Sequence, residues 1–161
     1  MSPAATAGTR DGGFETTVLS RAGRPPIGPA DARRLLSLLA RRLGVRGESV
    51  AVVFGDDAML AGLNLRYRGK DQATDVLSFP SRDGTEDPIR SGHLGDIAIS
   101  VDAVRRQARR AGHRASREAS ILMIHGFLHL MGYDHEVDDG QMEELERTMR
   151  WEMLGGGARG R

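Results

Sequence analysis

Three histidines that fall within eleven residues are the side chains best suited to chemistry in this chain. His125 and His129 are four residues apart in a segment that predicts a helix, so both imidazoles lie on one face, one turn apart. Gly132 then favours the left-handed backbone that ends a helix, which lets the chain bring His135 round to the same point. Three neutral imidazoles with a fourth position open for water are typical of a catalytic zinc site. The sequence therefore predicts one metal ion bound by His125, His129 and His135.

The spacing of the three histidines and the glycine resembles the extended zinc motif of the metzincin proteases. In that motif a glutamate follows the first histidine and acts as general base for the attacking water. This chain has Gly126 at that position, so peptide hydrolysis by the same mechanism is not expected. Asp134 precedes His135, and the sequence leaves open whether it orients a ligand imidazole or serves as a turn or cap residue.

Alternating apolar patterns, caps and helix-ending glycines predict the elements that must position these residues. Four short strands and five helices are expected, with a polar loop containing Gly84 and Pro88 between the last two strands. The expected strands are Phe14–Ser20, Ser49–Phe54, Asp75–Phe79 and Leu94–Ser100. The expected helices are Asp31–Leu43, a helix capped by Asp56 or Asp57 that runs to about Arg66, Asp102–Ala111, Ser116–Met131 and Gln141–Met153. Helices interleaved with a sheet of about four strands predict an α+β, or mixed α/β, fold with the metal site at the end of a helix.

The overall composition predicts one globular domain. The chain has 161 residues, 39% of them apolar and 28% charged, with a net charge of +1. Cysteine is absent, which excludes disulfides and thiolate ligands. No apolar run is long enough for a transmembrane helix and no secretory signal is evident, so a cytoplasmic protein without membrane partners is expected. The domain is assigned to residues 14–154, between a disordered leader (1–13) and a flexible tail (155–161).

Three separate segments, in the same order, resemble the YbeY family of bacterial endoribonucleases, which mature ribosomal RNA. The histidine segment His125–His135 matches the family motif H-G-x-L-H-L-x-G-Y-D-H throughout. A second segment runs from Leu63 to Asp71 and on through Thr74–Pro80, and a third is Leu94–Ser100. The Glu-rich segment Met142–Glu146 also fits the family's C-terminal end, so the resemblance covers roughly residues 14–154.

The resemblance implies a mixed α/β fold that holds one zinc ion per chain through the three histidines. It also implies cleavage of single-stranded RNA, maturation of the 16S rRNA 3′ end and late-stage ribosome quality control, with the ribosome or its small subunit as partner and no action on DNA. It identifies Arg68, in a stretch that reads as a polar loop, as the arginine needed for activity. A guanidinium matches phosphate oxygens in a bidentate way, which suits that role.

Several points stay open at the level of sequence. The proton acceptor for the reaction is Asp75, Asp96, a hydroxide on the metal or the RNA 2′-OH. A run of arginines within 105–117 forms a broad basic helix face that either binds RNA or is merely solvated. Two other functions compete: a zinc hydrolase acting on a peptide or small ester, and a non-catalytic ribosome assembly factor whose metal only stabilises the fold.

Overall fold

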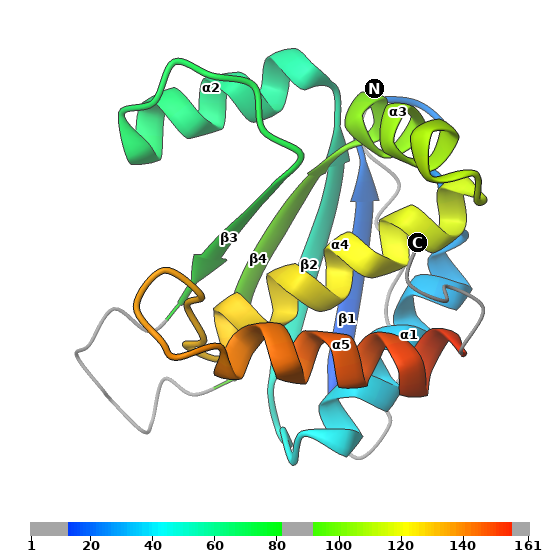
Figure 1. Ribbon diagram of the computed structural model, residues 1–161, viewed down its shortest axis with the longest axis vertical. Helices are drawn as coiled ribbons and strands as arrows, with labels where there is room; N and C mark the ends of the chain where they lie inside the picture. The colour runs from blue at the N-terminus through cyan, green and yellow to red at the C-terminus, as the bar shows by residue number, and fades with distance from the viewer. Residues whose placement is uncertain (1–12, 82–91, 156–161) are drawn as a thin grey trace.

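The computed structural model describes residues 13–81 and 92–155 and shows one mixed sheet with helices on both faces (Figure 1). The sheet has the order β1-β2-β4-β3, in which β1, β2 and β4 are parallel and β3 is antiparallel to β4 at one edge. The strands are β1 (Glu15–Ser20), β2 (Ser49–Gly55), β3 (Val76–Pro80) and β4 (His93–Ser100). The helices are α1 (Pro29–Arg42), α2 (Asp57–Arg68), α3 (Val101–Ala111), α4 (Ala115–Leu130) and α5 (Gln141–Leu154).

Helix α4 is the centre of the core because it packs against β3 and β4, and α5 runs alongside it (Figure 1). Most of its residues are buried, as its nearly continuous apolar sequence requires. Helix α1 lies on the same face of the sheet, against β1. The rings of Phe14 and Phe127 meet edge to face at 6.0 Å within this core.

Helix α2 covers the opposite face of the sheet. Leu77 of β3 and Ala98 of β4 form a second, smaller cluster with Leu60 of α2. Their neighbours Ser78 and Ile97 face α4 instead, since successive side chains of a strand point to opposite faces. Strand β3 therefore separates a face covered by α4 from a face covered by α2.

The expected α+β fold is confirmed, and each expected strand and helix is present with its ends shifted by no more than two residues. One placement was wrong: Arg68 is the last residue of α2 rather than part of a loop. The helix continues past Arg66 and ends at Gly69, which adopts the left-handed conformation of a helix C-cap at φ 68°. The cap is completed by the amide of Gly69, which donates to the Leu65 carbonyl at 3.0 Å.

Three expectations fall mainly or wholly outside the described residues. They are the leader 1–13, of which the structure describes only Gly13, the tail 155–161, of which it describes only Gly155, and the loop containing Gly84 and Pro88. Within residues 13–81 and 92–155, no helix combines the length and apolar character needed to cross a membrane.

Candidate metal centre

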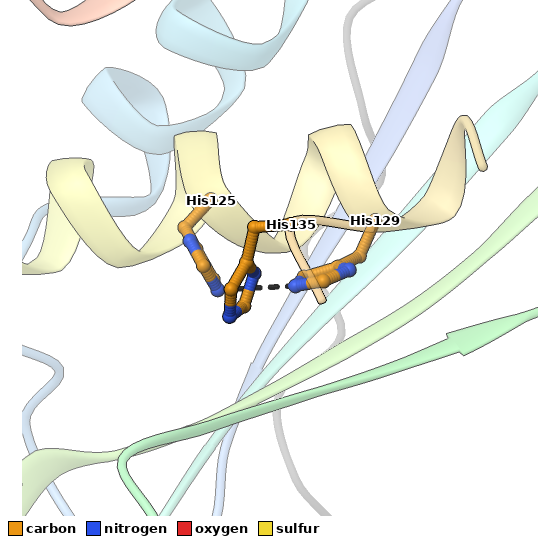
Figure 2. A group of neighbouring side chains, drawn as sticks. All are labelled: His125, His129 and His135. Atoms are coloured by element: carbon orange, nitrogen blue, oxygen red, sulfur yellow. Dashed lines mark hydrogen bonds between the residues drawn. The ribbon is translucent and has the colours of Figure 1, made fainter. Parts of the chain in front are cut away.

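The three histidines converge on one point (Figure 2). His125 and His129 project from the same face of α4, and His135 returns from the segment that follows the helix. One nitrogen from each ring can be chosen so that all three lie within 4.8 Å of one another. Two of the rings are half-buried and that of His135 is exposed, so the point they share is open to solvent from one side. The convergence predicted from the spacing of the residues is thus present.

The return of His135 depends on how α4 ends. Gly132 has φ 97°, the left-handed conformation expected for it, and the amide of Tyr133 donates to the carbonyl of Leu128 at 3.1 Å. The carboxylate of Asp134 then accepts the amide of Glu136 at 2.9 Å. The sequence left open whether Asp134 orients an imidazole or stabilises a turn, and this hydrogen bond is that of a turn residue.

A glutamate from another helix holds the first histidine. The Nδ1–H of His125 donates to Glu146 of α5 at 3.0 Å, and Arg150 donates to the same carboxylate oxygen at 3.0 Å. Burial raises the pKa of Glu146, but the hydrogen bonds and charges of His125 and Arg150 outweigh it, so the net shift is downward. The carboxylate is therefore ionised, and it leaves Nε2 as the free nitrogen of His125. Sequence reasoning missed this role of Glu146.

The second histidine is held in its neutral form. Burial and then the charge of His125 lower the pKa of His129, against a hydrogen bond to the backbone of Tyr133 that raises it. A neutral imidazole is the form that binds a metal ion.

The donor set fits a zinc ion. The Nε2 atoms of His125 and His129 are 3.2 Å apart. Two nitrogens bound to one tetrahedral zinc at about 2.0–2.1 Å are separated by about 3.3 Å, so this spacing suits two ligands of one ion. A third imidazole within reach leaves a fourth position for water or substrate, which a closed structural site does not need.

Gly126, which replaces the protease glutamate, points into the sheet. A Cβ at this position would lie 2.7 Å from Cγ2 of Ile97 and 3.1 Å from the hydroxyl of Ser78. That hydroxyl donates to the carbonyl of Gly126 at 2.9 Å, which ties α4 to β3. The position has no room for any side chain, so the fold itself excludes a glutamate base there.

A cavity of about 270 Å³ connects the histidines with residues from other elements. Arg68, at the end of α2, lines it together with Asp75 and Ser78 at β3. The carboxylate of Asp75 is held by the side-chain amide of Gln107 at 3.0 Å. All the residues that line the cavity are Arg68, Thr74, Asp75, Val76, Ser78, His125, His129, Asp134, His135 and Glu136.

Other residues singled out in the sequence lie elsewhere. Asp96 is absent from this cavity and pairs with His93 at 2.8 Å on an exposed part of β4. The arginines of α3 are exposed beside the start of α4, whereas the histidines lie towards its end (Figure 1). Arg106 is already paired with Asp57 at 2.7 Å. The expected basic face is therefore present, but it is separate from the cavity.

Comparison with known proteins gives a consistent result. A family model described as Endoribonuclease YbeY matches residues 30–153. Relatives with the same name are 47% identical over 115 residues in Koribacter versatilis, covering 71% of this chain and 70% of that protein, and 44% identical over 119 residues in Chelativorans sp., covering 73% of each. The solution structure of TM1509 from Thermotoga maritima matches 88% of this chain and 89% of its own, with a TM-score of 0.58 and 26% identity.

Proposed function

The chain belongs to the YbeY family of endoribonucleases, and from that premise we propose that it cleaves single-stranded RNA at the cavity shared by the three histidines and Arg68. The observation that carries the proposal is the position of Arg68. It comes from α2 on the opposite face of the sheet, yet it lines the same cavity as His125, His129 and His135 of the α4 region. A phosphate-binding cation next to a group of residues that can hold a metal ion suits the cleavage of a phosphodiester.

In this proposal the three histidines hold one zinc ion. When bound, zinc supplies a Lewis acid for a phosphate oxygen and lowers the pKa of water. Glu146 keeps the Nε2 of His125 directed at the ion, and the backbone of Tyr133 does the same for His129. Arg68 binds the phosphate at the cut or beside it and fixes its position.

Asp75 is the proton acceptor that we favour. Of the two carboxylates that the sequence left open, only Asp75 lines the cavity. Its Oδ2 accepts the amide of Gln107, which fixes the carboxylate and leaves Oδ1 to accept a proton from the attacking hydroxyl. Whether that hydroxyl belongs to water or to the RNA 2′-OH is decided by the product, because only 2′-OH attack gives a 2′,3′-cyclic phosphate.

Family membership supports a finer assignment. We assign the protein to maturation of the 16S rRNA 3′ end and to late-stage ribosome quality control, with the small ribosomal subunit as partner and the cytoplasm as the compartment. We further propose that residues 14–154 form the catalytic domain. The small, polar cavity provides few groups to read bases, so the choice of cleavage position falls to the ribosome.

The test is cleavage of a labelled single-stranded RNA by wild type, His129→Ala and Arg68→Ala. Matched controls are His93→Ala and Arg147→Ala, because both side chains are outside the cavity and Arg147 is an exposed arginine of α5. We expect cleavage by wild type and both controls, loss in both cavity variants, and loss in wild type after zinc is removed by a chelator. Equal cleavage by Arg68→Ala and Arg147→Ala would refute the role of Arg68. Intact rRNA processing with His129→Ala would favour the structural role for the metal.

A further inference from the structure

An aromatic pair lies beside the cavity but outside it. Tyr67 of α2 is 61% exposed, and its ring meets that of Phe79 edge to face, with centroids 5.2 Å apart and the planes at 67°. A single exposed aromatic residue is ordinary in a folded protein. A ring whose orientation is fixed by a second ring, while much of its surface stays open, is a surface on which an unpaired base can stack.

Phe79 gives this pair a rigid support. It is partly buried and packs against the cluster of Leu60, Leu77 and Ala98 beneath α2. The Tyr67 ring therefore contacts a side chain that is anchored in the sheet, and it loses little freedom when a ligand binds.

The chain places this pair directly across β3 from the histidines. Arg68 and Ser78 line the cavity, and the residues next to them in sequence, Tyr67 and Phe79, form the aromatic pair. Within the described residues β3 pairs with β4 alone, so no other strand covers its outer edge. A single RNA strand that leaves the cavity over this edge reaches the face of the sheet that α2 covers, where Tyr67 packs on Phe79.

The charges at this edge suit the same ligand. Arg66, Arg68 and Lys70 are within three residues of Tyr67 in the sequence, and all three are exposed. None of the three has an ion pair with another of the described residues. Cations that follow a backbone, combined with an aromatic surface for a base, are the features by which proteins bind single-stranded nucleic acids.

We propose that Tyr67, supported by Phe79, is a stacking site for one base of the RNA strand, adjacent to the nucleotide whose phosphate Arg68 binds. The site deepens the function proposed above and rests on it. It binds any of the four bases, because stacking uses the face of the base rather than its edge. It also gives a reason for single-strand preference, since a base paired in a duplex cannot reach the Tyr67 ring.

The experiment compares steady-state cleavage of an unstructured RNA by wild type, Tyr67→Ala, Tyr67→Leu and Tyr67→Phe. Trp151→Ala is the matched control, because Trp151 is an aromatic residue of α5 that is 68% exposed and lines no part of the cavity. We expect Tyr67→Ala and Tyr67→Leu to raise KM about five- to 150-fold, which corresponds to about 1–3 kcal/mol for one stacked base, with little change in kcat. Tyr67→Phe and Trp151→Ala keep the wild-type KM. If Tyr67→Ala fails to fold, Tyr67→Leu, which keeps an apolar contact with Phe79, decides the matter.

A second readout isolates stacking from other contacts. The same RNA is prepared with single abasic nucleotides on either side of the cut. Wild type should bind one of the abasic RNAs more weakly than the intact RNA. Tyr67→Ala, which lacks the stacking ring, should bind that abasic RNA and the intact RNA equally well. The stacking site is overturned if Tyr67→Ala has the KM of wild type, or if wild type and Tyr67→Ala lose the same affinity on going from intact to abasic RNA. In either case, cleavage by wild type still supports the proposed function. A wild type that cuts no RNA overturns both, and a Tyr67→Ala variant that cuts normally but loses binding to ribosomal protein shows a protein-docking surface instead.

Discussion

Glu146 and His125 lie on different helices and are joined by a hydrogen bond of 3.0 Å between the carboxylate of one and Nδ1 of the other. Because α5 packs against α4, this contact links the two helices. Arg150 donates to the same carboxylate oxygen, so hydrogen bonds between three side chains lead from α5 to the imidazole of His125. The arrangement makes Glu146 a positioning residue for the proposed ion.

Replacing Glu146 should weaken the binding of zinc. Glu146→Gln replaces the ionised acceptor of the His125 Nδ1–H with a neutral amide, and we expect the affinity for zinc to fall about 10- to 100-fold. Competition with a chromophoric chelator measures this directly, without any assay of RNA cleavage. Glu143→Gln is the control, because Glu143 is exposed on the same helix and forms an ion pair with Arg147 at 3.6 Å. Equal zinc affinity in the two variants would contradict the role of Glu146.

Two helical glycines should respond in opposite directions to alanine. In Gly126→Ala the new methyl group meets Ile97, so we expect the free energy of unfolding to fall by about 1–3 kcal/mol. At Gly62 of α2 a Cβ would have no neighbouring atom within 4 Å, so Gly62→Ala should raise stability by about 0.5–1 kcal/mol through helix propensity. Urea unfolding of both variants tests the pair. Gly126→Glu should fold less well still and show no peptidase activity, and a stable, proteolytic Gly126→Glu would be the opposite result.

Substitution of Asp75 and of Asp96 tests which group is the proton acceptor. Asp75→Asn keeps an oxygen for the Gln107 amide but cannot take up a proton, so we expect kcat to fall about 10²- to 10⁴-fold. Asp96→Asn should leave kcat of the isolated protein within about twofold, because Asp96 lies outside the cavity. Rates at saturating RNA give the comparison. If Asp75→Asn retained the wild-type kcat, another group would be the acceptor.

Asp57 should make the stability of the fold depend on pH in acid. A hydrogen bond from Arg106, and then one from Ser100, lowers the pKa of Asp57. Because the pKa is lowered on folding, the ionised carboxylate stabilises the folded protein at any pH above the pKa of Asp in the unfolded chain, about 3.9. This contribution is lost as the pH falls through the lower pKa of the folded state. We therefore expect Asp57→Asn to cost up to about 1 kcal/mol at neutral pH and to match wild type in strong acid. Thermal unfolding at several pH values tests this.

The control for Asp57→Asn is Asp71→Asn, since Asp71 is exposed and has no ion pair among the described residues. It should match wild type at every pH. A stability difference for Asp57→Asn that persisted unchanged into acid would point to packing rather than charge.

Local signals in the sequence were sufficient for much of the fold and for the centre of the site. The caps at Asp56 and Gly112 and the period of the apolar residues placed the elements, and the His-Gly-His spacing predicted the convergence of three rings. These features depend on neighbours within one or two helical turns, which is why a single sequence contains them.

Contacts between distant elements were not predictable in the same way. The partner of His125 is 21 residues away and depends on how α5 packs against α4. The choice between Asp75 and Asp96 depends on β3 running antiparallel at the sheet edge, and no local pattern encodes strand order. The pairing of Tyr67 with Phe79 likewise requires α2 to lie over β3, on the face that α4 leaves free.

The three histidines differ in how firmly the fold holds them, and this difference affects how fast an ion in the proposed site would exchange. His125 and His129 belong to a helix that is fixed to the sheet at Gly126, whereas His135 belongs to an exposed turn with local hydrogen bonds such as that from the Glu136 amide to Asp134. In the proposed site, an arriving ion would bind first to the helix pair and last to His135, and it would leave in the reverse order. We therefore expect the opening rate of the turn after Gly132 to set the lifetime of a bound ion, and the helix pair to set most of its affinity.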